Sequence, residues 1–351
     1  MITHSCHKHI FGHAVKSLKT VSQSDRQIML TMAPTEASLS KAEQQVNALR
    51  QIEFVGFSGK KQSRNRSIRI GAWNLQHCHF PEATAQILDR EKIDLALLTE
   101  LDVGVSRSNQ RHTIAEIAGS LGYGYGFAVE FLELSHYTPT HDISCSSKEN
   151  QLGFHGNGFT SHLASRRPVV IRLNPEADWF INPRRGQKRI GGRVGVAATF
   201  CVNQFEFVAV SVHLESDTDS AGRGRQMQSL LSAIEKYADQ LPVIIGGDFN
   251  TGAGHPGFDY SAEALFDVAK NHHFNWTSCN SPGPTSRISP VDSAIKQNIA
   301  HYDWFFTRGL STSGPSIVAA IDGSGNSISD HELIVVTLHT KTNLGDENNL
   351  R

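Results

Sequence analysis

Residues 244–251 read IIGGDFNT: an apolar run meets two glycines and is followed closely by Asp248 and Asn250. The apolar run predicts a buried β-strand, and Gly, Asp and Asn are ordinary residues of the turn after a strand. Asp248 and Asn250 are two positions apart, so in an extended backbone both side chains point to the same side. The stretch is therefore either a simple turn or one edge of a polar site, and the rest of the sequence is needed to distinguish the two.

Apolar strands and amphipathic helices alternate on both sides of this stretch. Strands are expected at residues 68–74, 95–100, 195–202, 207–214, 242–246, 302–307 and 333–338. Helices are expected at residues 38–52, 82–92, 113–121, 224–238 and 261–271, the last with Ser261 as its N-cap. Several strands are apolar on both faces, as strands are when layers cover both sides of a sheet. This order predicts a mixed α/β protein, in which residues 135–160 and 275–300 form long loops.

Composition limits the organisation and the class of the protein. Residues 1–62 are expected to be an N-terminal extension, partly helical or disordered, residues 63–341 the main domain, and residues 342–351 a polar tail. The formal net charge of −1 gives no overall field that would attract nucleic acid or a membrane. The five cysteines form no CxxC pair, which argues against a disulfide framework and favours a reducing compartment.

Location follows from the same composition. No apolar run approaches the roughly 20 residues that a transmembrane helix needs. We therefore expect a cytoplasmic protein, with a transit peptide in the basic, acid-poor residues 1–19 as the alternative.

Polar side chains interrupt the predicted strands at or near their C-terminal ends, or lie in an adjoining loop. They are Asn74, Glu100, His213, Asp248, Asn250, Asp303, Asp330 and His331. Each alone is explained by a turn, a cap or a buried histidine, but together they supply carboxylates, carboxamides and imidazoles without a thiolate. Mg²⁺ prefers oxygen ligands with one or two carboxylates, and phosphoryl transfer needs charge stabilisation and an in-line nucleophile. The set therefore predicts magnesium phosphoester chemistry, provided that the Gly/Ser-rich residues 323–329 bend the chain so that Asp330 and His331 share one site.

Six motifs in this order resemble the endonuclease/exonuclease/phosphatase superfamily, which includes deoxyribonuclease I, apurinic endonucleases, neutral sphingomyelinases and inositol polyphosphate 5-phosphatases. They are AWNLQ (72–76), LLTE (97–100), VSVHLES (210–216), IIGGDFNT (244–251), HYDWFF (301–306) and SDHELIVV (329–336). The resemblance implies a four-layer α/β sandwich, in which two packed mixed β-sheets are flanked by helices, and it makes residues 63–341 a catalytic domain.

The resemblance also implies a metal site. Glu100 resembles the main metal carboxylate of the family, with Asn74 and Asp330 close to the metal or its waters. The expected metal is Mg²⁺, with Mn²⁺ as a substitute.

Further roles follow for the catalytic groups. Asp248 resembles the group that orients or deprotonates the attacking water, and Asn250 the residue that steadies the phosphoryl oxygens. His331 matches the catalytic histidine and Asp303 the residue that orients it, since a carboxylate behind an imidazole fixes its tautomer and favours its protonated form. His213 matches a phosphate-contacting position. Whether Asp248 or His331 is the general base stays open.

The resemblance is weaker at residues 156–168, GNGFTSHLASRRP, where the family often has a strand like GNAILSR followed by a proline. Alignment on Asn157, which is expected to bind substrate, places His162 at the arginine position, whereas alignment on Pro168 places Arg166 there. We favour Arg166 as a phosphate contact.

Basic residues gather at 182–193, NPRRGQKRIGGR. This stretch is either a solvated loop or a rim that guides phosphate, with Arg193 as a substrate-binding residue and with Arg107 and Arg111 as additions to the rim. Arg223 and Arg225 begin a predicted helix, where cations are disfavoured, so an anion or a carboxylate partner is expected for them.

These observations predict a metal-dependent phosphoric ester hydrolase that attacks a phosphodiester with water, as a nuclease does. A lipid or inositol phosphate phosphoesterase on the same fold is the alternative, and nucleic acid is one of several possible phosphoester substrates. A non-catalytic binding protein is a third reading, but its usual mark is the loss of the Asp/Asn pair or of the catalytic histidine, and both are present. The sequence indicates no oligomeric state.

Overall fold

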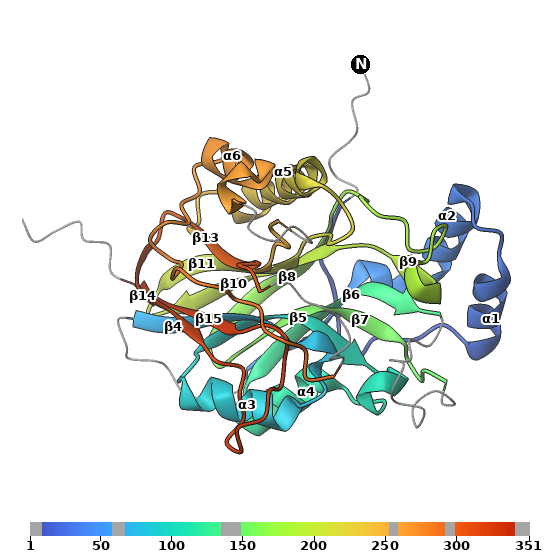
Figure 1. Cartoon of the computed structure of the whole chain (residues 1–351), viewed down its shortest axis with the longest axis horizontal. Coiled ribbons are helices and arrows are strands. Elements are labelled where there is room, and N and C mark those ends of the chain that lie inside the picture. Colours follow the sequence, from blue (N-terminus) through green and yellow to red (C-terminus); the bar gives the residue numbers. More distant parts are fainter. Residues whose placement is uncertain (1–8, 58–66, 135–148, 253–258, 292–298, 341–351) are drawn as a thin grey trace, which may run out of the picture.

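Two β-sheets pack face to face in the computed structural model, which describes residues 9–57, 67–134, 149–252, 259–291 and 299–340 (Figure 1). The six-stranded sheet has the order β1-β8-β10-β11-β12-β13. The nine-stranded sheet has the order β14-β15-β4-β5-β7-β6-β3-β2, with β9 paired to β6. Each sheet mixes parallel and antiparallel neighbours, since β11 is parallel to β12 and β4 is parallel to β5.

The strands of the six-stranded sheet are β1 (Ile10–Phe11), β8 (Ala164–Arg172), β10 (Val194–Val202), β11 (Phe205–His213), β12 (Val243–Asp248) and β13 (Asp303–Arg308). Those of the nine-stranded sheet are β2 (His13–Val15), β3 (Gln51–Val55), β4 (Ser67–Asn74), β5 (Leu95–Val103), β6 (Gly124–Glu133), β7 (Phe154–Ser161), β9 (Arg189–Gly191), β14 (Ser311–Val318) and β15 (Leu333–His339).

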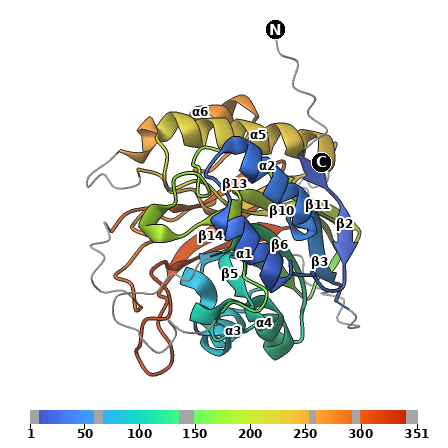
Figure 2. The same ribbon diagram turned by 90° about the vertical axis from the view of Figure 1, so that its right-hand side faces the viewer.

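Helices form the two outer layers. α5 (Ser220–Ala238) and α6 (Ala264–Asn271) cover the six-stranded sheet, and α3 (Pro81–Arg90) and α4 (Thr113–Leu121) cover the nine-stranded sheet (Figure 1). α1 (Gln23–Thr31) and α2 (Glu36–Gln45) lie at one side, near β2 and β3 (Figure 2). The expected four-layer α/β sandwich is therefore confirmed. In the described part of the chain, no helix combines the length and the hydropathy needed to span a bilayer.

The apolar alternation of the strands builds the layers. In β12, Ile244 packs in the core between the sheets, whereas Val243 and Ile245 pack in the core beneath α5 and α6. In β4, Ala72 faces the core between the sheets and Trp73 the core beneath α3 and α4. Because each sheet has a covered layer on both faces, its strands are apolar on both faces, which explains the pattern in the sequence.

The segment expected as an N-terminal extension supplies strands to both sheets. β1 pairs with β8 in the six-stranded sheet, and β2 pairs with β3 in the nine-stranded sheet, with Gly12 between them. The helix expected at residues 38–52 is α2, which ends at Gln45, and Ile52 lies in β3 instead. Residues 342–351, the expected tail, lie outside the described residues.

Two local expectations are wrong. The loop expected at residues 135–160 ends early, because β7 begins at Phe154 and pairs with both β5 and β6. Glycines in β7 hide its strand pattern in the sequence. Gly156 is required because its backbone lies so close to β6 that a Cβ would be 2.0 Å from the Ala128 carbonyl oxygen. Ser261 is not the N-cap of α6, which starts at Ala264 after Glu263.

Candidate active site

The polar strand ends meet where the two sheets face each other. Asn74 ends β4, and His213 and Asp248 end the parallel neighbours β11 and β12. Asp303 begins β13, which is antiparallel to β12, so Asp303 lies directly opposite Asp248. His331 precedes β15, which is antiparallel to β4. The topology therefore brings these five residues to one edge of the molecule.

A line of three buried groups runs through the site. His331 Nδ1 lies 2.7 Å from Asp303 Oδ2, and His331 Nε2 lies 3.7 Å from Asp248 Oδ2. Thr285 Oγ1 donates a hydrogen bond of 2.7 Å to the same Asp303 oxygen. Ser329 Oγ accepts a hydrogen bond from the His331 backbone N–H. Asp303 therefore fixes the imidazole with Nε2 directed to the Asp248 side.

The protonation of this line is set by burial and by the two carboxylates. Burial acts against the charged form of His331, but Asp303 and Asp248 outweigh it and raise the pKa of His331 well above its ordinary value. Burial, together with the nearby Asp303, raises the pKa of Asp248 to about 7, although His331 and Asn74 act in the opposite direction. Near neutral pH the site therefore holds an imidazolium beside a carboxylate that is only partly ionised.

Glu100 is the more accessible carboxylate. It has a left-handed backbone, with φ of 54°, and the β5–β7 pairing shifts register between Leu98 and Leu101. Such a bulge turns the Glu100 side chain out of the sheet, and 22% of that side chain is exposed. The amide nitrogen of Asn74 donates to Glu100 Oε1 at 3.1 Å and to Asp248 Oδ2 at 2.9 Å. Asn74 therefore links Glu100 to Asp248.

Asn250 and Asp330 complete this part of the site. The Asn250 N–H donates to Asp248 Oδ1 at 2.9 Å, and its side-chain amide donates to the Leu214 carbonyl at 3.0 Å. Asp330 is buried beside His331, and its backbone carbonyl accepts from the Arg287 N–H at 2.8 Å. The chain bends before β15 as expected, so Asp330 and His331 both lie at the site.

His213 is held in one tautomer by Arg193. Arg193 Nη1 lies 2.9 Å from His213 Nδ1, and a guanidinium can only donate, so Nδ1 accepts. Burial and the Arg193 charge hold the pKa of His213 well below its ordinary value. The neutral ring therefore carries its hydrogen on Nε2, which lies 3.5 Å from Asp248 Oδ2.

Arg193 and Asn157 lie in a buried layer behind His213. Arg193 contacts Glu130 Oε2 at 3.4 Å and Glu215 Oε2 at 3.3 Å. The Asn157 amide nitrogen donates to Glu130 Oε1 and to the Val194 carbonyl, each at 3.0 Å. Asn157 Oδ1 is buried and has no hydrogen-bond partner among the described residues.

Neither alignment of residues 156–168 brings a cation to the site. Arg166 lies near the start of β8, half exposed, with a bidentate contact to Glu206. The end of β8 that pairs with the start of β10, beside the buried layer, holds Arg172 instead. His162 contacts Asp94 at 2.7 Å, at the start of β5. The Arg166 prediction is therefore not supported, because strand register fixes which end of β8 reaches the site.

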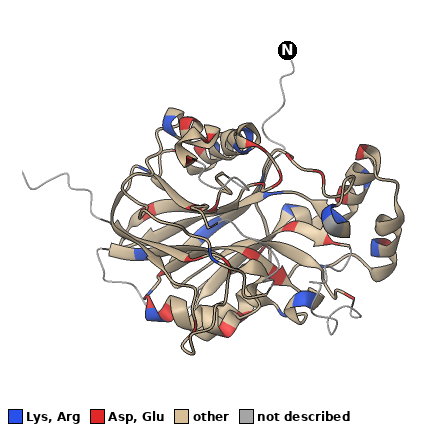
Figure 3. Cartoon of the chain, viewed as in Figure 1, with Lys and Arg blue, Asp and Glu red and all other residues tan. Residues whose placement is uncertain are grey.

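Most basic side chains of the expected rim that the structure describes pair with groups of the protein, although Arg184 is largely exposed. Lys188 Nζ donates to the carbonyls of Leu30 and Met32. Guanidinium groups pair with carboxylates in Arg107–Asp102, Arg111–Glu116, Arg184–Asp217, Arg189–Glu133, Arg223–Glu263 and Arg225–Glu176. Figure 3 shows the two signs of charge interspersed over the fold. The carboxylate partners expected for Arg223 and Arg225 are thus present, whereas the rim is not supported.

Replacement of Arg193 by Met is expected to destabilise the protein by about 3–5 kcal/mol, the usual cost of removing one partner of a buried ion pair. Burial already raises the pKa of Glu130, and Arg193 opposes that rise. Without Arg193 the buried Glu130 and Glu215 must bind protons, so the loss should be larger at pH 8 than at pH 5.

Urea unfolding at the two pH values measures this loss. Arg166→Met, which breaks the exposed pair with Glu206, serves as the control and should change little. Equal effects of the two substitutions would contradict the structural role of Arg193.

Known proteins share the fold of this chain. Three solved structures share the fold: an endonuclease/exonuclease/phosphatase from Beutenbergia cavernae, another from Bacteroides vulgatus, and the human Nocturnin catalytic domain with bound sulfate anion. The first is 16% identical over 78% of this chain and 72% of its own, with a TM-score of 0.55. The second is 12% identical over 78% and 98%, with a TM-score of 0.53, and the third is 18% identical over 82% and 96%, with a TM-score of 0.52.

Among curated proteins no sequence matches this chain. The sequence model of the Endonuclease/Exonuclease/phosphatase family, however, matches residues 71–331, from β4 to the histidine before β15. The chain therefore belongs to the Endonuclease/Exonuclease/phosphatase family.

Proposed function

We propose that this chain hydrolyses a phosphodiester by metal-assisted attack of water. The observation that carries the proposal is the buried line Asp303–His331–Asp248, joined through Asn74 to the partly exposed Glu100. Carboxylates and an imidazole in this order can accept a proton from the attacking water and donate one to the departing oxygen.

The residues present fit a divalent cation. Glu100 offers a carboxylate that is open to solvent, as Mg²⁺ requires because it keeps part of its water shell. Asp330 is a second carboxylate, and its charge acts on the neighbouring His331. Asn74 presents its amide nitrogen to Glu100, and its Oδ1 accepts from the Gln76 N–H, so it positions Glu100. Mg²⁺, with Mn²⁺ as a substitute, would supply charge stabilisation on the phosphoryl oxygens.

The protein groups then divide the proton transfers. Asp248, in its ionised form, accepts the proton of the attacking water, while the His331 imidazolium donates its Nε2 proton to the departing oxygen. His213 remains neutral and offers its Nε2–H as a hydrogen bond to the phosphoryl group. Because His331 Nε2 and Asp248 Oδ2 are 3.7 Å apart, the proton gained by Asp248 can pass back to His331 after release of the product.

One observation favours a second candidate, a phosphoester that carries an apolar group such as a lipid. Among the described side chains of the expected rim, Arg184, Lys188 and Arg189 are paired with carboxylates or carbonyls. Large apolar side chains are exposed at Phe80, Tyr260, Ile288 and Ile299. Ile288 follows Arg287, whose N–H binds the Asp330 carbonyl, and Tyr260 packs on His301.

The test is hydrolysis of bis(p-nitrophenyl) phosphate, plasmid DNA, short RNA, an inositol polyphosphate and sphingomyelin vesicles, each with Mg²⁺, Mn²⁺ or a chelator. We expect metal-dependent hydrolysis of at least one substrate, reduced roughly 100-fold or more in Glu100→Gln. Arg166→Met is the matched control and should keep full activity. Activity that survives both the chelator and Glu100→Gln would refute the proposal, and metal binding without any turnover would favour a binding protein.

A further inference from the structure

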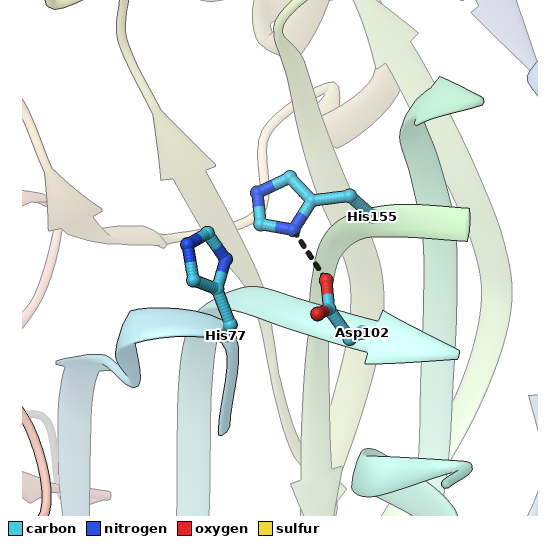
Figure 4. Close-up of side chains that lie close together, drawn as sticks. All are labelled: His77, Asp102 and His155. Carbon is cyan, nitrogen blue, oxygen red and sulfur yellow. Dashed lines mark hydrogen bonds and ion pairs between the residues drawn. The ribbon is translucent and has the colours of Figure 1, made fainter. Parts of the chain in front are cut away.

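A second group of ligand-type side chains lies beside Glu100, and the proposed hydrolysis does not use it. His77, Asp102 and His155 come from the turn after β4, from β5 and from β7, and one nitrogen or oxygen of each lies within 4.8 Å of those of the others (Figure 4). None of the three was predicted to be functional from the sequence. Figure 4 shows the two imidazole rings on one side of the Asp102 carboxylate.

His155 is oriented by a carboxylate. Its Nδ1 lies 2.8 Å from Asp102 Oδ1 and 3.2 Å from Arg107 Nη2. Because the two hydrogens of Nη2 are directed to Asp102 and Glu133, Nδ1–H donates to Asp102 and the lone pair is on Nε2. In Figure 4 this second nitrogen points away from Asp102, on the side of the His77 ring. A histidine whose other ring nitrogen donates to a buried carboxylate is the usual arrangement of a metal-ligating histidine.

His77 carries an unused nitrogen at the same place. Its Nδ1 is buried and has no hydrogen-bond partner among the described residues, and it lies 3.7 Å from Glu100 Oε2. The rings of His77 and His155 have centroids 5.3 Å apart and planes at 60°. A buried nitrogen without a partner is unfavourable, and the left-handed backbone of His77, with φ of 67°, adds to that cost. A bound ligand would offset both.

The charges around the group favour a cation over an anion. Arg107 directs Nε and Nη2 to the two oxygens of Asp102, at 2.7 and 2.8 Å, and Nη2 also meets Glu133 at 3.2 Å. These guanidinium hydrogens are therefore already bound to carboxylates and do not form an anion cradle. Glu100, Asp102 and Glu133 carry three negative charges against the two positive charges of Arg107 and Arg189, so one negative charge is left for a positive ion to balance.

We propose that His77 and His155 form a second cation site that shares Glu100 with the hydrolytic site and takes a transition-metal ion of the zinc class. Two imidazole nitrogens and one carboxylate are ligands that Zn²⁺ and Co²⁺ prefer, whereas Mg²⁺ selects oxygen ligands. Asp102 is the positioning residue of the site, because it fixes the ring of His155, and Arg107 holds Asp102. The site exists whether or not the chain hydrolyses phosphoesters.

Titration of the full chain with Co²⁺ tests the site, with the visible absorption of bound Co²⁺ and the metal content after dialysis as readouts. In His77→Asn the band from this site should disappear and its affinity should fall at least about tenfold. Asn is chosen because it tolerates a left-handed backbone. His155→Gln should act in the same way. The histidines near the N-terminus are common to all variants, so the difference from the parent protein isolates this site.

His162→Asn is the matched control, since His162 also pairs with an aspartate, Asp94, but faces no second imidazole in a shared group. It should leave the spectrum unchanged. An unchanged Co²⁺ spectrum and affinity in His77→Asn would overturn the proposal, and this variant alone decides it if His155→Gln does not fold. Glu100→Gln should weaken the binding of Co²⁺, while the visible absorption band of Co²⁺ bound to the two imidazoles remains. If the Co²⁺ band disappears in Glu100→Gln but is unchanged in His77→Asn, the metal binds at the hydrolytic site alone.

Discussion

Asp248→Asn is expected to lower kcat/KM by roughly 10³–10⁴-fold while the fold is retained, because a general base contributes effects of this size. The substitution keeps the volume of the side chain and its place opposite Asp303, but an amide cannot accept the proton of water. The measurement is kcat/KM on the best substrate of the panel with saturating Mg²⁺. Asn250→Ala, which leaves the carboxylate in place, should cost less.

The pH profile gives the same base a second signature. Since the pKa of Asp248 is raised to about 7, its carboxylate, the active form, is populated only as the pH rises through that value. A cation at Glu100 would stabilise this carboxylate through Asn74. The rise of kcat/KM with pH should therefore have its midpoint at or below about pH 7. The rise should be absent in Asp248→Asn. A rise that persists in the variant would assign it to another group.

Asp248→Asn should also make the protein more stable at pH 8. The folded-state pKa of about 7 lies above the ordinary value, so the folded state binds this proton more tightly than the unfolded chain does. The stability from that proton is present below about pH 4 and is lost as the pH rises through about 7. The gain in the free energy of unfolding at pH 8 is at most about 4 kcal/mol. The loss of Asp248 as a charged partner of His331 reduces this gain. Thermal unfolding at pH 4 and pH 8 measures this difference, and a variant that is less stable than the parent at pH 8 would contradict it.

Asp303→Asn is expected to lower kcat by roughly 10⁴-fold on substrates with poor leaving groups, as the loss of an imidazole-orienting carboxylate does elsewhere. Asp303 accepts from His331 Nδ1 at 2.7 Å and from Thr285 Oγ1 at 2.7 Å. An amide at this position can donate to Nδ1, which would favour the neutral ring in the opposite tautomer. The raised pKa of His331 depends on Asp303, so the imidazolium that donates to the departing oxygen is lost.

The leaving group separates this role from a purely structural one. A p-nitrophenolate leaves without a proton, so the loss in Asp303→Asn should be much smaller on bis(p-nitrophenyl) phosphate than on an alkyl phosphodiester. Thr285→Val removes one hydrogen bond to Asp303 but keeps the carboxylate, and it should show a weak form of the same selectivity. Equal losses on both kinds of substrate would argue that Asp303 only holds the loop together.

The sequence predicts the centre of this site because strand ends carry it. Asn74, His213 and Asp248 end strands whose apolar pattern is plain, and parallel neighbours bring such ends to one edge. The register of a bulge is not visible in the sequence. Glu100 was expected at the end of a strand over residues 95–100, but β5 continues to Val103, and a bulge inside it exposes Glu100.

Ion pairs between residues that are distant in the chain limit what the sequence predicts outside the centre of the site. The cations of residues 182–193 look like a solvated patch in the sequence, but Arg189 and Arg193 are neutralised by Glu133, Glu130 and Glu215 from other strands. Thr285 could not be found either, since it lies in a loop rich in Ser, Pro and Asn with no strand pattern. Partners that are distant in the chain decide whether a charge faces solvent or a buried carboxylate, and one sequence does not contain that information.

The placement of β1 and β2 has a consequence for how the chain is made. The ribosome releases residues 10–15 before their partner strands, since Ile10 pairs with Ile171 and Ala14 with Ile52. The partner of β2 therefore emerges soon after it, and the partner of β1 much later. Until β8 appears, β1 has no place in its sheet, and until β1 arrives, the edge of β8 remains open to pairing with other chains. A purification tag fused directly before residue 10 would therefore crowd the seam between β1 and β8.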